Sequence, residues 1–121
     1  MVMRKVNLKD KFAQILEFES PKIVGELNGQ YVKLSKLKGE FVWHSHANED
    51  ELFLIVSGRL RMQLRTGDVI LEEGEFFIVP RGVEHNPVAD PECHIMLFEP
   101  KSTLNTGDVV NEKTVEKLDW L

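Results

Sequence analysis

The chain of 121 residues contains one cysteine, one tyrosine, four histidines and no long hydrophobic run. The single cysteine, Cys93, excludes an internal disulfide; no leader-like segment follows Met1, and together these features favour a reducing, cytoplasmic setting. No apolar stretch approaches the roughly 20 residues of a membrane-spanning helix, so we expect no membrane partner. The net charge is −5 and Lys and Arg form no run. Nucleic acid is therefore not the expected partner, because phosphate binding needs a basic face.

Turn signals divide the chain at short intervals. Asn28-Gly29 between two apolar runs is typical of a two-residue hairpin, and Gly or Pro marks most of the other breaks. Several intervening segments alternate apolar and charged residues, as Leu60, Met62 and Leu64 do. The pattern predicts an all-β sandwich or barrel, with strands at residues 22–27, 30–37, 40–46, 51–56, 59–65, 68–71, 75–79 and 92–98.

The two ends of the chain have the spacing of short helices rather than strands. The first helix would follow a cap at Asn7 and bury Leu8, Phe12 and either Ile15 or Leu16. The second would follow Asn111 and bury Val115, Leu118 and Leu121.

Three of the four histidines belong to one pattern. His44-Ser45-His46 is followed by four residues and Glu51, and His85 lies further along the chain. Side chains two residues apart share a face only on a strand, so both imidazoles of the first pair could converge on one ion. Glu51 would open the next strand beside them, and His85 would arrive after the turn Pro80-Arg81-Gly82. Imidazole and carboxylate suit a divalent transition metal such as Zn, Fe, Mn or Ni.

These two segments resemble the paired signatures of a small single-domain cupin. In the first, Gly39 precedes His44-Ser45-His46 and Glu51, and six residues separate Glu51 from Gly58. In the second, Gly74 is followed by five residues, Pro80-Arg81-Gly82, two residues and His85. The gap after Gly39 is one residue shorter than usual, and Ala89 replaces the closing Asn; neither position is a ligand in the family.

The resemblance implies a fold, a ligand set and an assembly. The fold is a jelly-roll β-barrel of two antiparallel sheets, forming a single domain over residues 1–121 with a motif-bearing core at about 30–100. The implied metal ligands are His44, His46, Glu51 and His85, with one divalent transition metal per chain. Small relatives are commonly homodimers, so a homodimer is expected.

Other polar residues near the pattern compete for the ligand roles. Glu49 and Asp50 lie beside Glu51, but only Glu51 leaves six residues before Gly58, so we expect the other two to be solvated loop charges. His94 has no motif around it and is expected to be packed or exposed at an edge. Cys93 is expected to be a small buried hydrophobe.

Strand alternation also predicts the lining of a pocket. If His44, His46 and Glu51 point inward, then Val42 and Phe53 do so as well, and Met62 follows from its own strand. Phe41 and Trp43 would face outward, where a second subunit would cover them. Tyr31 and Lys33 share a strand face and could supply polar contacts to the pocket, but they are expected to lie in solvent.

The fold alone does not determine the function. The resemblance favours a metal-dependent enzyme acting on a small polar molecule, with isomerase or epimerase chemistry (as in mannose-6-phosphate isomerase-like relatives) or dioxygenase chemistry. The absence of a phosphate-binding cluster weakens the sugar-phosphate version. The alternatives are a non-catalytic module that binds or senses a small molecule, and a protein whose metal site is vestigial.

Overall fold

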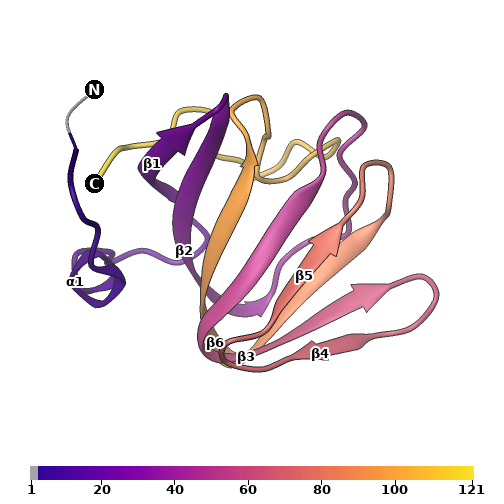
Figure 1. Cartoon of the computed structure of the whole chain (residues 1–121). Coiled ribbons are helices and arrows are strands. Elements are labelled where there is room, and N and C mark those ends of the chain that lie inside the picture. The colour runs from indigo at the N-terminus through magenta and orange to yellow at the C-terminus, as the bar shows by residue number, and fades with distance from the viewer. Residues whose placement is uncertain (1–2) are drawn as a thin grey trace.

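A computed structural model describes residues 3–121, and these fold as the predicted all-β domain (Figure 1). Its single α-helix lies at the N-terminal end, and no helix in the described residues has the length and apolar character to cross a membrane. The elements in chain order are α1 (Leu8–Ala13), β1 (Lys22–Leu27), β2 (Gln30–Glu40), β3 (Glu51–Leu64), β4 (Val69–Leu71), β5 (Phe76–Val79) and β6 (His85–Pro100).

The strands form one antiparallel sheet in the order β1-β2-β6-β3-β4, and β5 pairs with β3 beside β4. The two long strands, β3 and β6, pair along most of their lengths. The first part of β3 is flanked by β5 and its last part by β4. Figure 1 shows the sheet curling into a jelly-roll barrel, with β1 and β2 on one side and β4 and β5 on the other.

The inner face of the barrel holds the main hydrophobic core. Because side chains alternate along a strand, β3 contributes Phe53 and Ile55 to this face, and β6 contributes Ile95 and Leu97. The full cluster of buried residues is Leu37, Phe53, Ile55, Leu60, Met62, Leu71, Val79, Ala89, Cys93, Ile95 and Leu97.

The N-terminal helix covers part of the outer face. Its predicted cap is confirmed, since the Asn7 side chain accepts a hydrogen bond of 3.0 Å from the Asp10 backbone N–H. Phe12, within the helix, and Ile15, just after it, pack in one cluster with Val24 and Leu34. Each large side chain buried in this way contributes about 1.5–3 kcal/mol, enough to hold a helix too short to be stable alone.

The predicted C-terminal helix does not form. Residues 111–121 contain no helix; instead Trp120 forms a parallel bridge with Ile23, and the Leu121 backbone N–H donates to the Ile23 carbonyl at 2.9 Å. The open edge of β1 offers backbone partners to an extended chain. Three apolar residues at helical spacing are too few to outweigh them.

Two predicted strands have other bounds in the structure. The segments 51–56 and 59–65 form one strand, β3, and the strand predicted at 92–98 begins earlier, at His85, as part of β6. Gly58 marks a register shift instead of a hairpin, with a φ of 85°. A Cβ at Gly58 would lie 2.4 Å from the Glu92 carbonyl oxygen, so glycine allows β3 and β6 to stay paired at this bend.

Cys93 is fully buried in the core, and burial raises the pKa of its thiol to about 12. Because the thiolate is the reactive form, we expect the folded protein to leave Cys93 unlabelled by a disulfide-exchange reagent at pH 8. Protein unfolded in urea should titrate one thiol per chain. Labelling of the folded protein at the rate of the unfolded one would contradict the burial of Cys93.

Candidate metal centre

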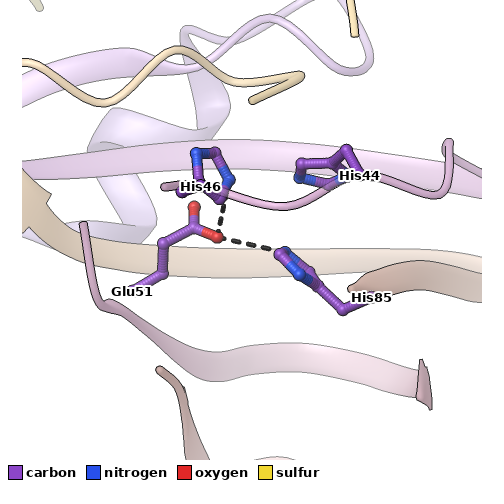
Figure 2. Close-up of side chains that lie close together, drawn as sticks. All are labelled: His44, His46, Glu51 and His85. Carbon is purple, nitrogen blue, oxygen red and sulfur yellow. Dashed lines mark ion pairs between the residues drawn. The ribbon is translucent and has the colours of Figure 1, made fainter. Parts of the chain in front are cut away.

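The structure brings His44, His46, Glu51 and His85 together in one buried cluster. One ligand atom from each residue lies within 4.8 Å of the others. Their side chains converge from three parts of the chain, as Figure 2 shows. Each residue is at most 4% exposed, so the cluster is an inner feature of the barrel and not a chance group on the surface.

The backbone around the cluster is only partly regular. The predicted strand over residues 40–46 does not form: β2 ends at Glu40, and His44 makes only an isolated bridge with His85. In that bridge each backbone N–H donates to the other residue's carbonyl, at 3.0 and 2.9 Å. The Gly82 N–H donates to the His46 carbonyl at 2.7 Å, so the turn before β6 is tied to the histidine pair.

Two of the imidazoles are oriented by backbone carbonyls. His44 Nδ1 lies 2.8 Å from the Val42 carbonyl oxygen, and His85 Nδ1 lies 2.9 Å from that of Val83. A proton on each Nδ1 would satisfy these contacts and leave the Nε2 lone pair free. This is the arrangement that normally fixes a histidine for metal coordination.

The Glu51 carboxylate lies between the Nε2 atoms of His46 and His85. Its Oε1 is 2.9 Å from His46 Nε2 and 3.1 Å from His85 Nε2, contacts drawn as dashed lines in Figure 2. None of these three buried atoms makes an aligned hydrogen bond. Ligand atoms about 2.1 Å from a common ion are separated by about 3.0–3.4 Å at octahedral or tetrahedral angles. The short, misaligned contacts therefore fit a set of metal ligands better than a hydrogen-bond network.

The surroundings of His44 and Glu51 favour the neutral imidazole and the ionised carboxylate, which are the forms that bind a metal ion. Burial, followed by the proximity of His85, lowers the pKa of His44 to about 4. Burial opposes ionisation of Glu51, but the contacts with His46 and His85 hold the pKa of Glu51 well below its usual range. A neutral imidazole beside an ionised carboxylate is the state that binds a divalent ion.

A buried ion pair behind Glu51 was missed by the sequence reasoning. Lys33 was predicted to lie in solvent, but its Nζ lies 2.9 Å from Glu99 Oε1, and both side chains are buried. Glu99 neighbours Glu51, since Leu52 pairs with Phe98 in the β3–β6 register. Burial and the charge of Glu51 raise the pKa of Glu99, whereas Lys33 acts in the opposite direction. The alternation of Lys33 with Ser35 and Leu37 along β2 was the available signal.

A cavity of about 40 Å³ adjoins the cluster. Phe53 is among the residues that line it, whereas Val42 and Met62 are not. Met62 lies in the core, and Phe41 lines the cavity instead of facing outward, because the chain beyond Glu40 does not alternate as a strand. The full lining is Glu19, Pro21, Ser35, Leu37, Phe41, His44, Glu51, Phe53, Pro87, Ile95, Leu97, Glu99 and Asn105.

The remaining candidates lie outside the cluster. Asp50 accepts a hydrogen bond of 2.8 Å from the Arg81 backbone N–H, and Glu49 accepts one of 2.9 Å from Ser102. His94 lies 2.7 Å from a Glu92 carboxylate oxygen and stacks on Phe12. Asp50 is therefore engaged elsewhere. Glu49 also lies 4.0 Å from His46 Nδ1 and its side chain is only 14% exposed, so the prediction that it is a solvated loop charge is wrong.

The guanidinium of Arg65 lies 3.8 Å from the ring centroid of Trp43. This contact supplies cover for Trp43 within the same chain. Trp43 therefore does not need a second subunit to cover it, and the homodimer stays a prediction.

The C-terminal segment supports the histidine pair from outside. The Asp108 N–H donates to the Ser45 carbonyl at 3.0 Å, and the Asp108 carboxylate accepts from the Ser45 N–H at 2.9 Å. Gly107, with a φ of 57°, lies so close that a Cβ would be 2.2 Å from the Ser45 oxygen. No motif in the sequence pointed to this contact.

Comparison with known proteins gives the same assignment of fold. The sequence profile described as Cupin domain matches residues 31–99. A crystal structure of a cupin-2 domain containing protein from Shewanella frigidimarina is 43% identical in sequence, with a TM-score of 0.78 over 79% of this chain and 94% of that chain.

Two further likenesses are weaker. The Bacillus subtilis protein YdbB is 30% identical over 63 residues, which cover 51% of this chain and only 56% of YdbB. A hydroquinone 1,2-dioxygenase crystallised with Cd²⁺ and 4-hydroxybenzonitrile is 20% identical, with a TM-score of 0.65 over 76% of this chain and 70% of that chain. This last similarity concerns the fold alone.

Proposed function

This chain belongs to the Cupin domain family, and we propose that it is a metal-dependent enzyme acting on a small molecule. One divalent transition metal would be held by His44, His46, Glu51 and His85. The observation that carries the proposal is the convergence of these four buried ligand atoms beside a cavity. Residues 1–121 would form one cupin domain, and a cytoplasmic location stays a prediction.

The bound metal would act as a Lewis acid on an oxygen of the substrate. The residues of this chain would supply the rest of the site. The backbone carbonyls of Val42 and Val83 hold two imidazoles in place, and Phe41 and Phe53 contribute apolar walls beside the cluster. Such walls exclude water and strengthen the electrostatic interactions inside.

The cavity narrows the choice of substrate. No Lys or Arg is among the described residues that line it, and Lys33, which lies behind it, is paired with Glu99. A phosphate group would therefore find no free Lys or Arg side chain among the lining residues, only the metal itself. Among the predicted activities, this favours a small substrate without phosphate over a sugar phosphate.

A non-catalytic binding module is the second candidate. The titratable side chains that line the cavity are His44, Glu51, Glu99 and Glu19, and the first two belong to the ligand cluster. Glu99 is paired with Lys33, which leaves few groups for general-base work. Saturable binding of a small molecule without turnover would favour this candidate.

The metal assignment is tested by measuring metal content per chain and the affinity for Zn²⁺ by calorimetry. We expect one ion per chain in the wild type, and a loss of affinity of at least about 100-fold in His44→Ala and in His85→Ala, since each removes a ligand. His94→Ala removes a histidine outside the cluster and should bind metal like the wild type. Unchanged metal content in both ligand variants would contradict the proposed site.

A further inference from the structure

One imidazole of the metal-ligand cluster, that of His46, has no partner for its second ring nitrogen. The Nδ1 atoms of His44 and His85 lie 2.8 and 2.9 Å from backbone carbonyl oxygens. His46 Nδ1 is buried as well, yet it has no hydrogen-bond partner among the described residues. A neutral histidine that binds an ion through Nε2 carries its proton on Nδ1. Because a buried donor without an acceptor is costly, His46 needs an acceptor beside Nδ1.

The carboxylate of Glu49 stands next to this nitrogen. Glu49 Oε1 lies 4.0 Å from His46 Nδ1, and the Glu49 and His46 side chains are 14% and 2% exposed. A hydrogen bond from a ring N–H spans about 2.7–3.2 Å, so a shift of Glu49 by about 1 Å toward the ring would form one. A carboxylate that is mostly removed from water gains from such a partner.

Glu49 is braced on its other side by a distant part of the chain. Its Oε2 accepts a hydrogen bond of 2.9 Å from the Ser102 hydroxyl, which lies beyond β6. Glu49, Ser102 and His46 line one hollow on the outer side of the cluster, together with Asp108. The Asp108 carboxylate already accepts from the Ser45 backbone N–H at 2.9 Å. Glu49 Oε1 is therefore the acceptor best placed for the ring of His46.

We propose that Glu49 is a positioning residue of the metal centre, and that its Oε1 accepts the hydrogen bond of His46 Nδ1–H when Nε2 of His46 binds the ion. The contact keeps the lone pair on Nε2, fixes the plane of the ring and makes that nitrogen a stronger ligand. Backbone carbonyls do the same for His44 and His85, whereas His46 depends on a side chain that Ser102 holds in place. The inference rests on the proposed metal site and adds to it a residue that does not touch the ion.

The hydrogen bond can be observed by NMR in protein labelled with ¹⁵N at histidine and saturated with Zn²⁺. In the wild type we expect all three ligand imidazoles to carry a proton on Nδ1 that is protected from exchange with water. Glu49→Ala should lose the Nδ1–H signal of His46 through exchange, because this nitrogen then faces the hollow without an acceptor. The Nδ1–H signals of His44 and His85 should remain, since backbone carbonyls bind these protons.

Competition with a chelator measures the same contact as an affinity for Zn²⁺. Glu49→Ala should bind Zn²⁺ at least about tenfold more weakly than the wild type, and Ser102→Ala about threefold more weakly. The double variant Glu49→Ala/Ser102→Ala should be no weaker than Glu49→Ala alone, because Ser102 acts through Glu49. Glu49→Gln keeps an oxygen that can accept, so it should recover the His46 signal and most of the affinity.

Asp50→Asn is the matched control. It removes a carboxylate charge at the next position but keeps the oxygen that accepts from the Arg81 N–H, so it should bind Zn²⁺ like the wild type. An unchanged His46 signal in Glu49→Ala would overturn the inference, whatever the affinity. So would a loss of affinity that Asp50→Asn reproduces, because any nearby negative charge would then suffice. Failure of the wild type to bind Zn²⁺ would instead overturn the metal site itself.

Discussion

Replacing Lys33 by Met is expected to lower the free energy of unfolding by about 3–5 kcal/mol. Lys33 is 1% exposed and supplies the cation of a 2.9 Å ion pair with Glu99. Its loss would leave Glu99 buried next to Glu51, with two carboxyl groups facing one another across paired strands. Urea unfolding of the metal-free protein, followed by circular dichroism, measures the change.

Two variants separate this effect from the loss of a long side chain. Lys101→Met breaks a 3.0 Å ion pair with Glu26 that is largely exposed and should cost little stability, because water screens such a pair. The double variant Lys33→Met/Glu99→Leu removes both buried charges and should recover most of the lost stability. If Lys33→Met were no more destabilising than Lys101→Met, the buried pair would not be a stabilising element of the barrel.

The cluster of His44, His46, Glu51 and His85 could be predicted from the sequence because residues close in the chain must also lie close in space. His44 and His46 lie two residues apart before a strand, and Glu51 opens that strand, so short-range geometry places all three near one point. His85 was added through the turn that precedes it. The structure brings the same four residues together, although the segment that carries the histidine pair is held by a bridge to His85 and not by a regular strand.

The features that the sequence did not reveal depend on contacts between distant segments. The Lys33–Glu99 pair joins residues 66 positions apart. Alternation places Lys33 on the face of β2 that holds Leu37, but nothing near Lys33 in the sequence identifies Glu99 as its partner. Phe41 lines the cavity because the chain leaves strand geometry after Glu40, which alternation cannot anticipate. Trp120, near the end of the chain, pairs with Ile23 at the edge of β1. The backbone partners at this strand edge outweighed the helical spacing of the apolar residues in 111–121.

Gly107 provides the sharpest test of whether the C-terminal segment belongs to the metal centre. Gly107→Ala would place a Cβ 2.2 Å from the Ser45 carbonyl oxygen and 3.0 Å from the His44 ring. Backbone cannot yield as a flexible side chain does, so the segment that carries both histidines must shift. We expect Zn²⁺ affinity to fall at least about tenfold, as when supporting contacts of metal ligands are lost. The free energy of unfolding should fall by about 2–4 kcal/mol.

Gly39→Ala separates displacement of the site from backbone strain. Gly39 has a φ of 68° against 57° for Gly107, but a Cβ there meets nothing within 4 Å. Both variants therefore bear the cost of a left-handed alanine, about 1–2 kcal/mol, and only Gly107→Ala pushes on the histidine pair. Competition with a chelator measures the two affinities for Zn²⁺. If both variants bound Zn²⁺ like the wild type, the cluster would be held by the β3–β6 framework alone. A loss of Zn²⁺ affinity in Gly107→Ala alone would instead show that residues 104–108 hold the histidine pair in position.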